Sequence, residues 1–219
     1  MTVDQKTEGQ FRAPERAGDC VLPLSEEVYS QLVSLHGAMV KAACQRILRD
    51  PALAEDAAQE VFLLLVRKLP SLPTRTILGG WLYVTACHLA LTHRRTHARR
   101  WQRENQPEAM ENLMNPAQDT HSLWRDLEPL LDDAMLTLTE RQRELVLFHY
   151  FQNNSQRAAA GLVGCSESVA SRELAAAIES LRRFFSRHGV AVSGTALVSL
   201  LTAHAGGCER TNRKSWRTL

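Results

Sequence analysis

Cationic and aromatic side chains gather in one long stretch of this chain. No Asp or Glu occurs between Glu60 and Glu104, and Trp81 and Trp101 lie inside this stretch. Its cations are Arg67, Lys68, Arg75, Arg94, Arg95, Arg99, Arg100 and Arg103. Fixed cations neutralise phosphates and aromatic rings stack on bases, so the combination is typical of a nucleic-acid surface. A solvated helix face carries similar charges, and charge alone does not separate the two interpretations.

Carboxylates lie on both sides of that basic stretch. The segment from Glu104 to Glu144 holds ten of them, although the net charge of the whole chain is only +2. Another polar cluster, on one side of a predicted helix, consists of Glu55, Asp56, Gln59 and Glu60. Charge segregated in this way indicates separate surfaces for separate partners.

Metal and enzyme chemistry find weaker support in the sequence. His93 and His97 are four residues apart and would share a helix face that could hold Zn²⁺, but spacing fixes no third ligand. We expect histidines facing phosphates or solvent, with no metal and no cofactor. Asp56 and Glu60 could act as acid and base, yet such a cluster is more commonly a solvated or docking face. The sequence has no phosphate-binding loop, Gly-rich cofactor turn or nucleophile elbow, so we expect no enzyme.

The composition predicts the elements that position these groups. Ala and Leu are abundant, and aromatic residues make up only 6% of the chain, which favours an all-α protein. Ser25 and the pair Asp50-Pro51 are helix-start signals. We expect helices over 25–48, 51–68, 77–100, 127–138, 139–151, 155–164, 166–185 and 195–204.

These helices divide into two small domains joined by a flexible linker. A polar, Pro-containing N-terminus predicts a leader, and a second irregular stretch with Pro107 and Pro116 predicts the linker. The predicted units are a flexible leader 1–24, a first domain 25–105, a linker 106–125, a second domain 126–188 and a C-terminal extension 189–219.

A helix-turn-helix candidate lies in the second domain. Ala160 and Gly164 have the spacing that close helix approach and a tight turn require, and Ala170 would be buried in the second helix. The residues that could meet base edges in a major groove are Ser166, Glu167, Ser168, Ser171 and Arg172. A plain pair of antiparallel helices fits the same pattern.

The sequence predicts a cytoplasmic protein with no membrane partner. Its first ten residues are polar, and the most apolar late segment, 190–205, is too short and too polar to span a bilayer. Five cysteines without paired spacing fit reduced thiols. Cys44, Cys87 and Cys165 lie in apolar contexts and are expected in the core.

Three runs carry a resemblance to a known family. They are "DPALAEDAAQEVFLLLVRKL", "GGWLYVTACHLALTHRR" and "LTLTERQRELVLFHYFQNNSQRAAAGLVGCSESVASRELAAAIESLRRFF". Together they resemble the two conserved domains of RNA polymerase sigma factors of the extracytoplasmic-function type, within the sigma-70 family. The resemblance covers roughly 25–103 and 126–185, most of the chain. It implies that the protein binds core RNA polymerase and directs promoter recognition and transcription initiation.

The resemblance also implies roles for particular residues. The face that docks on the polymerase clamp helices matches Asp56, Gln59, Glu60 and Phe62. The element that reads and melts the minus-ten promoter region, with its flanking phosphate contacts, matches Trp81, Tyr83, His88, Arg94, Arg95, Arg99 and Arg100. The reader of the minus-thirty-five element matches 166–172. An anti-sigma factor is a further candidate partner.

Departures from the family pattern keep other interpretations open. The third helix has His88 and Thr92 where the family usually has Asn and Asp, and the last helix has Ala175 and Ala176 where Arg is common. A stand-alone helix-turn-helix regulator would use only the second domain. A degenerate sigma-like interaction module would bind polymerase or another protein without starting transcription.

Overall fold

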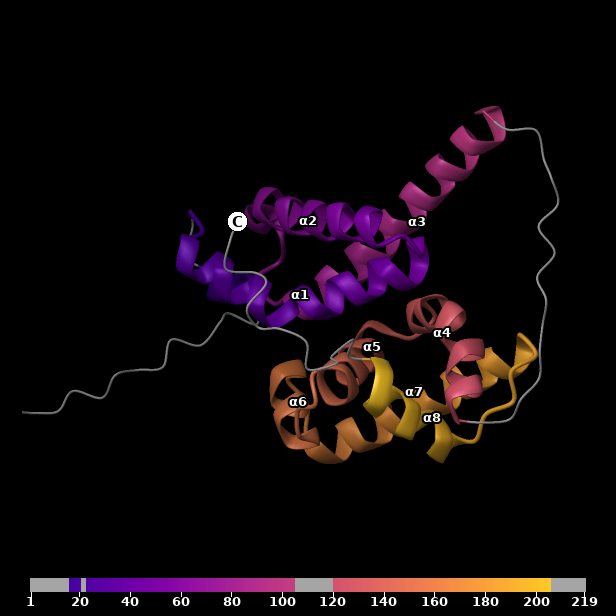
Figure 1. Ribbon diagram of the computed structural model, residues 1–219. Helices are drawn as coiled ribbons and strands as arrows, with labels where there is room; N and C mark the ends of the chain where they lie inside the picture. The colour runs from indigo at the N-terminus through magenta and orange to yellow at the C-terminus, as the bar shows by residue number, and fades with distance from the viewer. Residues whose placement is uncertain (1–15, 21–22, 105–119, 206–219) are drawn as a thin grey trace, which may run out of the picture.

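The protein is all-α, as the composition predicts. The computed structural model describes residues 16–20, 23–104 and 120–205, and within these ranges it contains helices and no strand. Arg16 and Ile77 form an isolated β-bridge in the same part of the chain. The helices form two lobes that pack against each other (Figure 1).

The first lobe contains α1 (Glu26–Leu48), α2 (Pro51–Lys68) and α3 (Leu78–Glu104). The Ser25 hydroxyl accepts a hydrogen bond from the Val28 amide, and the Asp50 carboxylate accepts from the amides that follow Pro51. These caps fix where α1 and α2 begin, as predicted. The third helix continues to Glu104, past its predicted end at Arg100.

Each helix of this lobe contributes an apolar stripe to one core. Leu32 and Val40 of α1, Leu65 of α2 and Leu82 of α3 are fully buried. Cys44 and Cys87 are buried as predicted, whereas Cys165 of the other lobe is half-buried. Packing of the three stripes leaves the polar side of α2 facing solvent.

The second lobe holds five helices and two π-helical turns in the described residues. Their bounds are α4 (Thr120–Leu136), α5 (Glu140–Val146), η3 (Leu147–Phe151), α6 (Gln156–Val163), α7 (Glu167–Arg187), α8 (Gly194–Leu200) and η4 (Leu201–Ala205). The predicted capping box between Thr139 and Gln142 opens α5. α8 and η4 pack on α7 and η3, so 194–205 of the expected C-terminal extension joins this lobe.

Two stretches expected to be irregular are partly structured. α4 begins at Thr120, inside the predicted linker, because Trp124 is buried and its ring stacks on His204 with centroids 4.9 Å apart. In the expected leader, the amides of Ala17 and Gly18 donate hydrogen bonds to the carbonyls of Thr76 and Thr74, both at 2.9 Å. Both stretches are therefore held in place by tertiary contacts, which the local sequence does not encode.

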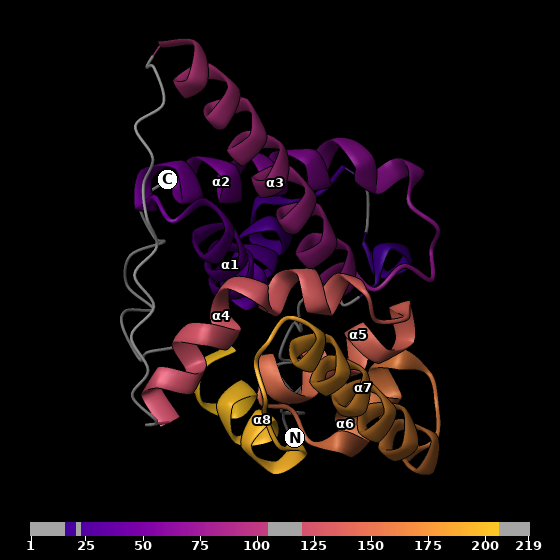
Figure 2. The same cartoon turned by 90° about the vertical axis from the view of Figure 1, so that its right-hand side faces the viewer.

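The lobes meet along a face built from α1 and α3 on one side and α4, α5 and η3 on the other. Figure 2 shows α4 lying between the first lobe and the remainder of the second. None of the helices in the described ranges is long and apolar enough to cross a membrane.

Candidate functional site

The exposed side of α2 combines carboxylates with apolar side chains. Asp56 and Gln59 are exposed and Glu60 is partly exposed, in agreement with a polar face. One and two turns further along, Leu63 and Val66 are 53% and 43% exposed. Neither residue is among the predicted contacts, although Leu63 follows Gln59 by four residues and Val66 follows Leu63 by three, which is the spacing of one helix face.

Phe62 does not belong to this exposed side. Its side chain is buried in the first lobe and lies edge-on to Tyr29 of α1, with ring centroids 6.3 Å apart. Helical geometry explains the difference, because Phe62 shares a face with the buried Ala58 and Leu65. The expectation that Phe62 lies on a docking face therefore does not fit this structure.

Glu60 links α2 to α3. Its carboxylate lies 3.0 Å from His93 Nε2. The candidate zinc ligand His93 thus has a carboxylate partner, and the described residues contain no group of three His, Cys, Asp or Glu side chains placed to hold a metal. The pair holds the polar side of α2 against the start of the basic part of α3.

The basic end of α3 projects beyond the rest of the first lobe (Figure 1). Arg94, Arg95 and His97 are exposed there, and so are Thr92 and His88, which precede Arg95 by one and two helical turns. The side chains of Arg99 and Arg100 lie outside the described residues. The exposed cations stand on a helix end, where phosphates of an extended strand could reach them.

Trp81 and Tyr83 differ from these exposed residues. Trp81 is half-buried and packs against the core. Tyr83 is fully buried: its hydroxyl donates to Asp132 Oδ1 of α4 at 2.5 Å, and its ring lies edge-on to Phe151 of η3 at 6.0 Å. In this arrangement the Tyr83 ring cannot meet a base, so its predicted contact with DNA requires the lobes to separate.

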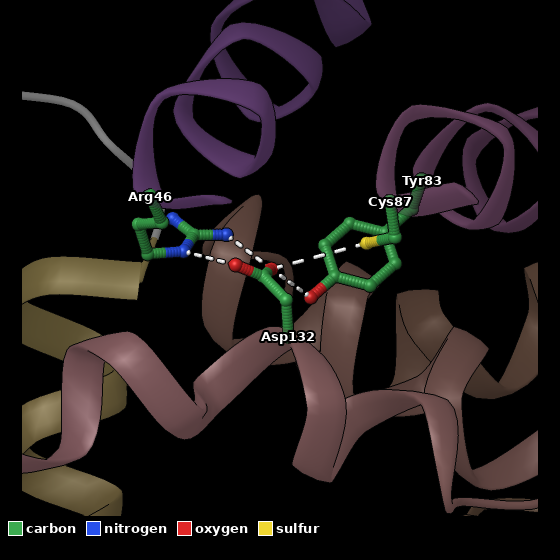
Figure 3. A network of polar contacts seen from close by, with 4 residues as sticks. All are labelled: Arg46, Tyr83, Cys87 and Asp132. Carbon is green, nitrogen blue, oxygen red and sulfur yellow. Dashed lines mark hydrogen bonds and ion pairs between the residues drawn. The ribbon is translucent and has the colours of Figure 1, made fainter. Parts of the chain in front are cut away.

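Asp132 is the centre of a buried polar network between the lobes (Figure 3). Arg46 of α1 binds its carboxylate in bidentate fashion, with Nε donating at 2.9 Å and Nη2 at 2.7 Å. The two side chains are only 6% and 5% exposed. Cys87 Sγ lies 4.0 Å from the same carboxylate. This geometry is the strong, fork-to-carboxylate form of an ion pair.

Burial and the charge of Asp132 shift the pKa values of the side chains in and beside this network. Burial disfavours a charge on Arg46, but the charge of Asp132 and its hydrogen bonds, with smaller contributions from Tyr83 and Cys87, together outweigh burial and hold the pKa of the guanidinium above its ordinary value. Burial, reinforced by the Asp132 charge, raises the pKa of Tyr83 well above its usual range. The same two causes raise the pKa of Cys44 to about 12. The tyrosine and the thiol therefore stay neutral, and Asp132 has one cationic partner in the network.

A second patch of interlobe contact surrounds the two glycines that begin α3. The Gln152 amide donates to Nδ1 of His36, a fully buried α1 side chain, at 3.3 Å. Burial lowers the pKa of His36 to about 4. Glu144 of α5 lies against Gly80, and burial, with a contribution from the charge of Glu140, raises its pKa to about 7. Two titratable groups with opposite responses to pH thus lie in one interface.

The helix-turn-helix forms as predicted. Gly164 ends α6 in the left-handed conformation at φ 78°, Ser166 caps α7, and Ala160 and Ala170 are buried where the helices meet. The predicted base-reading residues Ser166, Glu167, Ser168, Ser171 and Arg172 are all exposed.

The helix-turn-helix also has two further polar contacts of note. Glu167 pairs with Arg157 at 3.2 Å. From the segment that precedes α1, Arg16 Nη2 donates to the Leu162 carbonyl at the end of α6, at 2.7 Å.

Comparison with known families accounts for both lobes. Residues 32–100 match the family Sigma-70 region 2, and residues 129–181 match the family Sigma-70, region 4. The first range contains the α2 face and the basic part of α3, and the second contains the helix-turn-helix. The fold and these matches define a two-domain helical architecture that pairs Sigma-70 region 2 with Sigma-70 region 4. The chain belongs to the sigma-70 family of RNA polymerase sigma factors, with the region 2 and region 4 pairing expected of the extracytoplasmic-function type.

Proteins similar to the chain include a curated relative and two solved structures. The relative, a probable RNA polymerase sigma factor RfaY from Xanthomonas campestris pv. campestris, is 26% identical over 198 residues; the match spans 87% of this chain but only 48% of the relative's length. The sigma factor RpoE of Bartonella quintana, solved with the anti-sigma factor NepR, matches 74% of this chain and 98% of that chain, at 19% identity and a TM-score of 0.37. CnrH, solved with the cytosolic domain of CnrY, matches 78% and 93%, at 16% identity and a TM-score of 0.34.

Proposed function

We propose that this protein is an extracytoplasmic-function type sigma factor that binds core RNA polymerase and directs it to promoters. The observation that carries the proposal is the presence, in one chain, of sequence matches to both Sigma-70 regions. A stand-alone regulator that uses a helix-turn-helix alone has no need of the region 2 match or of the exposed face on α2.

The exposed side of α2 is the proposed polymerase contact. Asp56, Gln59 and Glu60 offer negative charge and hydrogen-bond acceptors, and Leu63 and Val66 add exposed apolar area beside them. Protein interfaces commonly combine an apolar centre with a charged rim, which fixes orientation. A positively charged helical surface with an apolar groove would complement this face.

The proposed promoter contacts divide between the lobes. The basic end of α3, with Arg94 and Arg95, would follow the phosphates of the opened minus-ten strand, and Tyr83 would stack on an unpaired base. The exposed side of α7, from Glu167 to Arg172, would enter the major groove of the minus-thirty-five element. The exposure of the α3 arginines and of the α7 residues supports these two assignments. Tyr83 is buried, so its assignment has no such support.

Such a factor performs no covalent step of its own. Its contribution is to position polymerase and to hold an opened strand, and it would act in the cytoplasm with the transcription machinery. An anti-sigma factor remains a proposed further partner.

Reconstituted transcription tests the proposal. Purified core polymerase with this protein is expected to produce discrete run-off transcripts from a library of promoter fragments, and Asp56→Lys is expected to abolish both transcripts and co-purification with core. Asp133→Lys, at an exposed position of α4, is the matched control and should retain both. Absence of transcripts with intact binding to core would favour the degenerate interaction module, and absence of both would overturn the proposal.

A further inference from the structure

The second lobe covers Tyr83, which is the fully buried aromatic side chain of the predicted minus-ten element. Tyr83 projects from α3 into the interface, where Asp132 accepts its hydroxyl hydrogen bond and Phe151 packs against its ring. Both contacts come from the second lobe. Separation of the lobes would therefore remove both contacts and uncover the Tyr83 side.

The contact between the lobes contains polar and charged side chains, whereas the interior of each lobe is apolar. Its members include Arg46, Asp132, Gln152, His36 and Glu144, and the buried residues within each lobe are almost all aliphatic or aromatic. Charged groups regain hydration when a polar contact opens, whereas an apolar core gains nothing from exposure. Separation of intact lobes is thus more accessible than unfolding of either one.

We propose that Asp132 is a latch that holds the free protein closed, with region 4 covering Tyr83, and that this latch must open before the protein can stack on an unpaired promoter base. The proposal rests on the proposed function for its DNA-binding consequence, while the closed state itself rests on geometry alone. Arg46 is the receiving side of the latch, because loss of the Asp132 charge would leave a buried guanidinium without its counter-ion.

In the closed form the stacking residue of the proposed DNA-binding surface is covered, while its arginines remain accessible. Arg94 and Arg95 stay exposed in the closed form, whereas Tyr83 is inaccessible. A closed molecule could meet phosphates but not stack Tyr83 on a base. The affinity for unpaired DNA is then reduced by the fraction of molecules that are open.

The lobe separation is measured first, in the full-length protein and without any ligand. Fluorophores are placed at exposed positions of the two lobes, Ser30 and Ser186, after the half-buried Cys20 and Cys165 and also Cys208 are replaced by Ser. Asp132→Asn is expected to lengthen the distance between the fluorophores and to raise the radius of gyration in solution scattering. Asp133→Asn, the exposed neighbour, is expected to change neither.

The DNA consequence is measured with a single-stranded oligonucleotide as the probe. Asp132→Asn should bind it about tenfold or more tightly than the wild type, as expected when a minor open state becomes dominant. In the Asp132→Asn background, Tyr83→Phe keeps a stacking ring and should retain the gain, whereas Tyr83→Ala should lose it.

Each outcome decides one part of the inference. An Asp132→Asn protein as compact as the wild type would overturn the latch. An opened protein with unchanged oligonucleotide affinity, or with a gain that survives Tyr83→Ala, would overturn the role of Tyr83. Failure of the wild type and the opened variant alike to bind core polymerase would refute the proposed function, while the distance measurement would still decide whether the latch exists.

Discussion

Gly80 of α3 lies directly against Glu144 of α5 in the other lobe. A Cβ atom at Gly80 would lie 3.0 Å from Glu144 Cγ and 3.2 Å from its Oε1. At Gly79 a Cβ atom would lie 3.1 Å from Cε1 of His36, which belongs to the same lobe, and 3.6 Å from Gln152 Nε2 of the other lobe. Gly80 therefore lets the two lobes approach where a side chain would hold them apart, and Gly79 lets α3 lie close to His36 of α1 within the first lobe.

A larger side chain at Gly80 should act as a wedge. Gly80→Leu is expected to separate the lobes and to raise the radius of gyration in solution scattering, because overpacking of a close contact typically costs about 1–3 kcal/mol. Gly161→Leu is the matched control, since a Cβ atom there would meet nothing within 4 Å. Equal compactness of the two variants would show that the Gly80 contact does not govern closure.

Glu144 should make the protein less stable as pH rises. Its pKa is raised from 4.5 to about 7, so the folded state keeps a proton that the unfolded state has already released. The free energy of unfolding of the wild type, relative to Glu144→Gln, is expected to fall by about 2 kcal/mol between pH 5 and pH 7. Urea titrations of both proteins at a series of pH values measure this difference, and a difference that is independent of pH would contradict it.

His36 should have the opposite effect. Its pKa is lowered from 6.5 to about 4, so the unfolded state takes up a proton below pH 6.5 while the folded state stays neutral. The free energy of unfolding of the wild type, relative to His36→Gln, is expected to rise by about 2 kcal/mol between pH 5 and pH 7. The two contributions nearly cancel in the wild type, and each single variant should reveal the slope of the group that remains.

Local signals predicted the helices well because the caps lie in the sequence itself. Ser25, Asp50, Thr139, Ser155 and Ser166 each accept a hydrogen bond from the first turn of the helix that they precede. Such bonds join residues two or three positions apart, so composition and order suffice to find them.

Residues that depend on distant partners were harder to place. Trp124 becomes part of α4 through stacking on His204, and Tyr83 is buried by residues of the other lobe. No local pattern specifies a contact across 49 positions of the chain, such as that of Tyr83 with Asp132. Phe62 differs from these two, because its burial follows from the helical period that it shares with Ala58 and Leu65, whereas only the family resemblance implies a docking role for it.

The exposed apolar residues of α2 should matter for polymerase binding but not for folding. Leu63→Ser removes apolar area from a side chain that is 53% exposed, so the free energy of unfolding should change by less than about 0.5 kcal/mol. If Leu63 lies near the centre of the proposed interface, its loss should weaken binding to core polymerase roughly tenfold or more, which corresponds to at least about 1.4 kcal/mol. Leu35→Ser, at a comparably exposed apolar position of α1, is the control and should bind core normally. Fluorescence anisotropy with labelled protein and purified core measures both affinities, and equal losses at the two positions would place the polymerase contact elsewhere than the exposed side of α2.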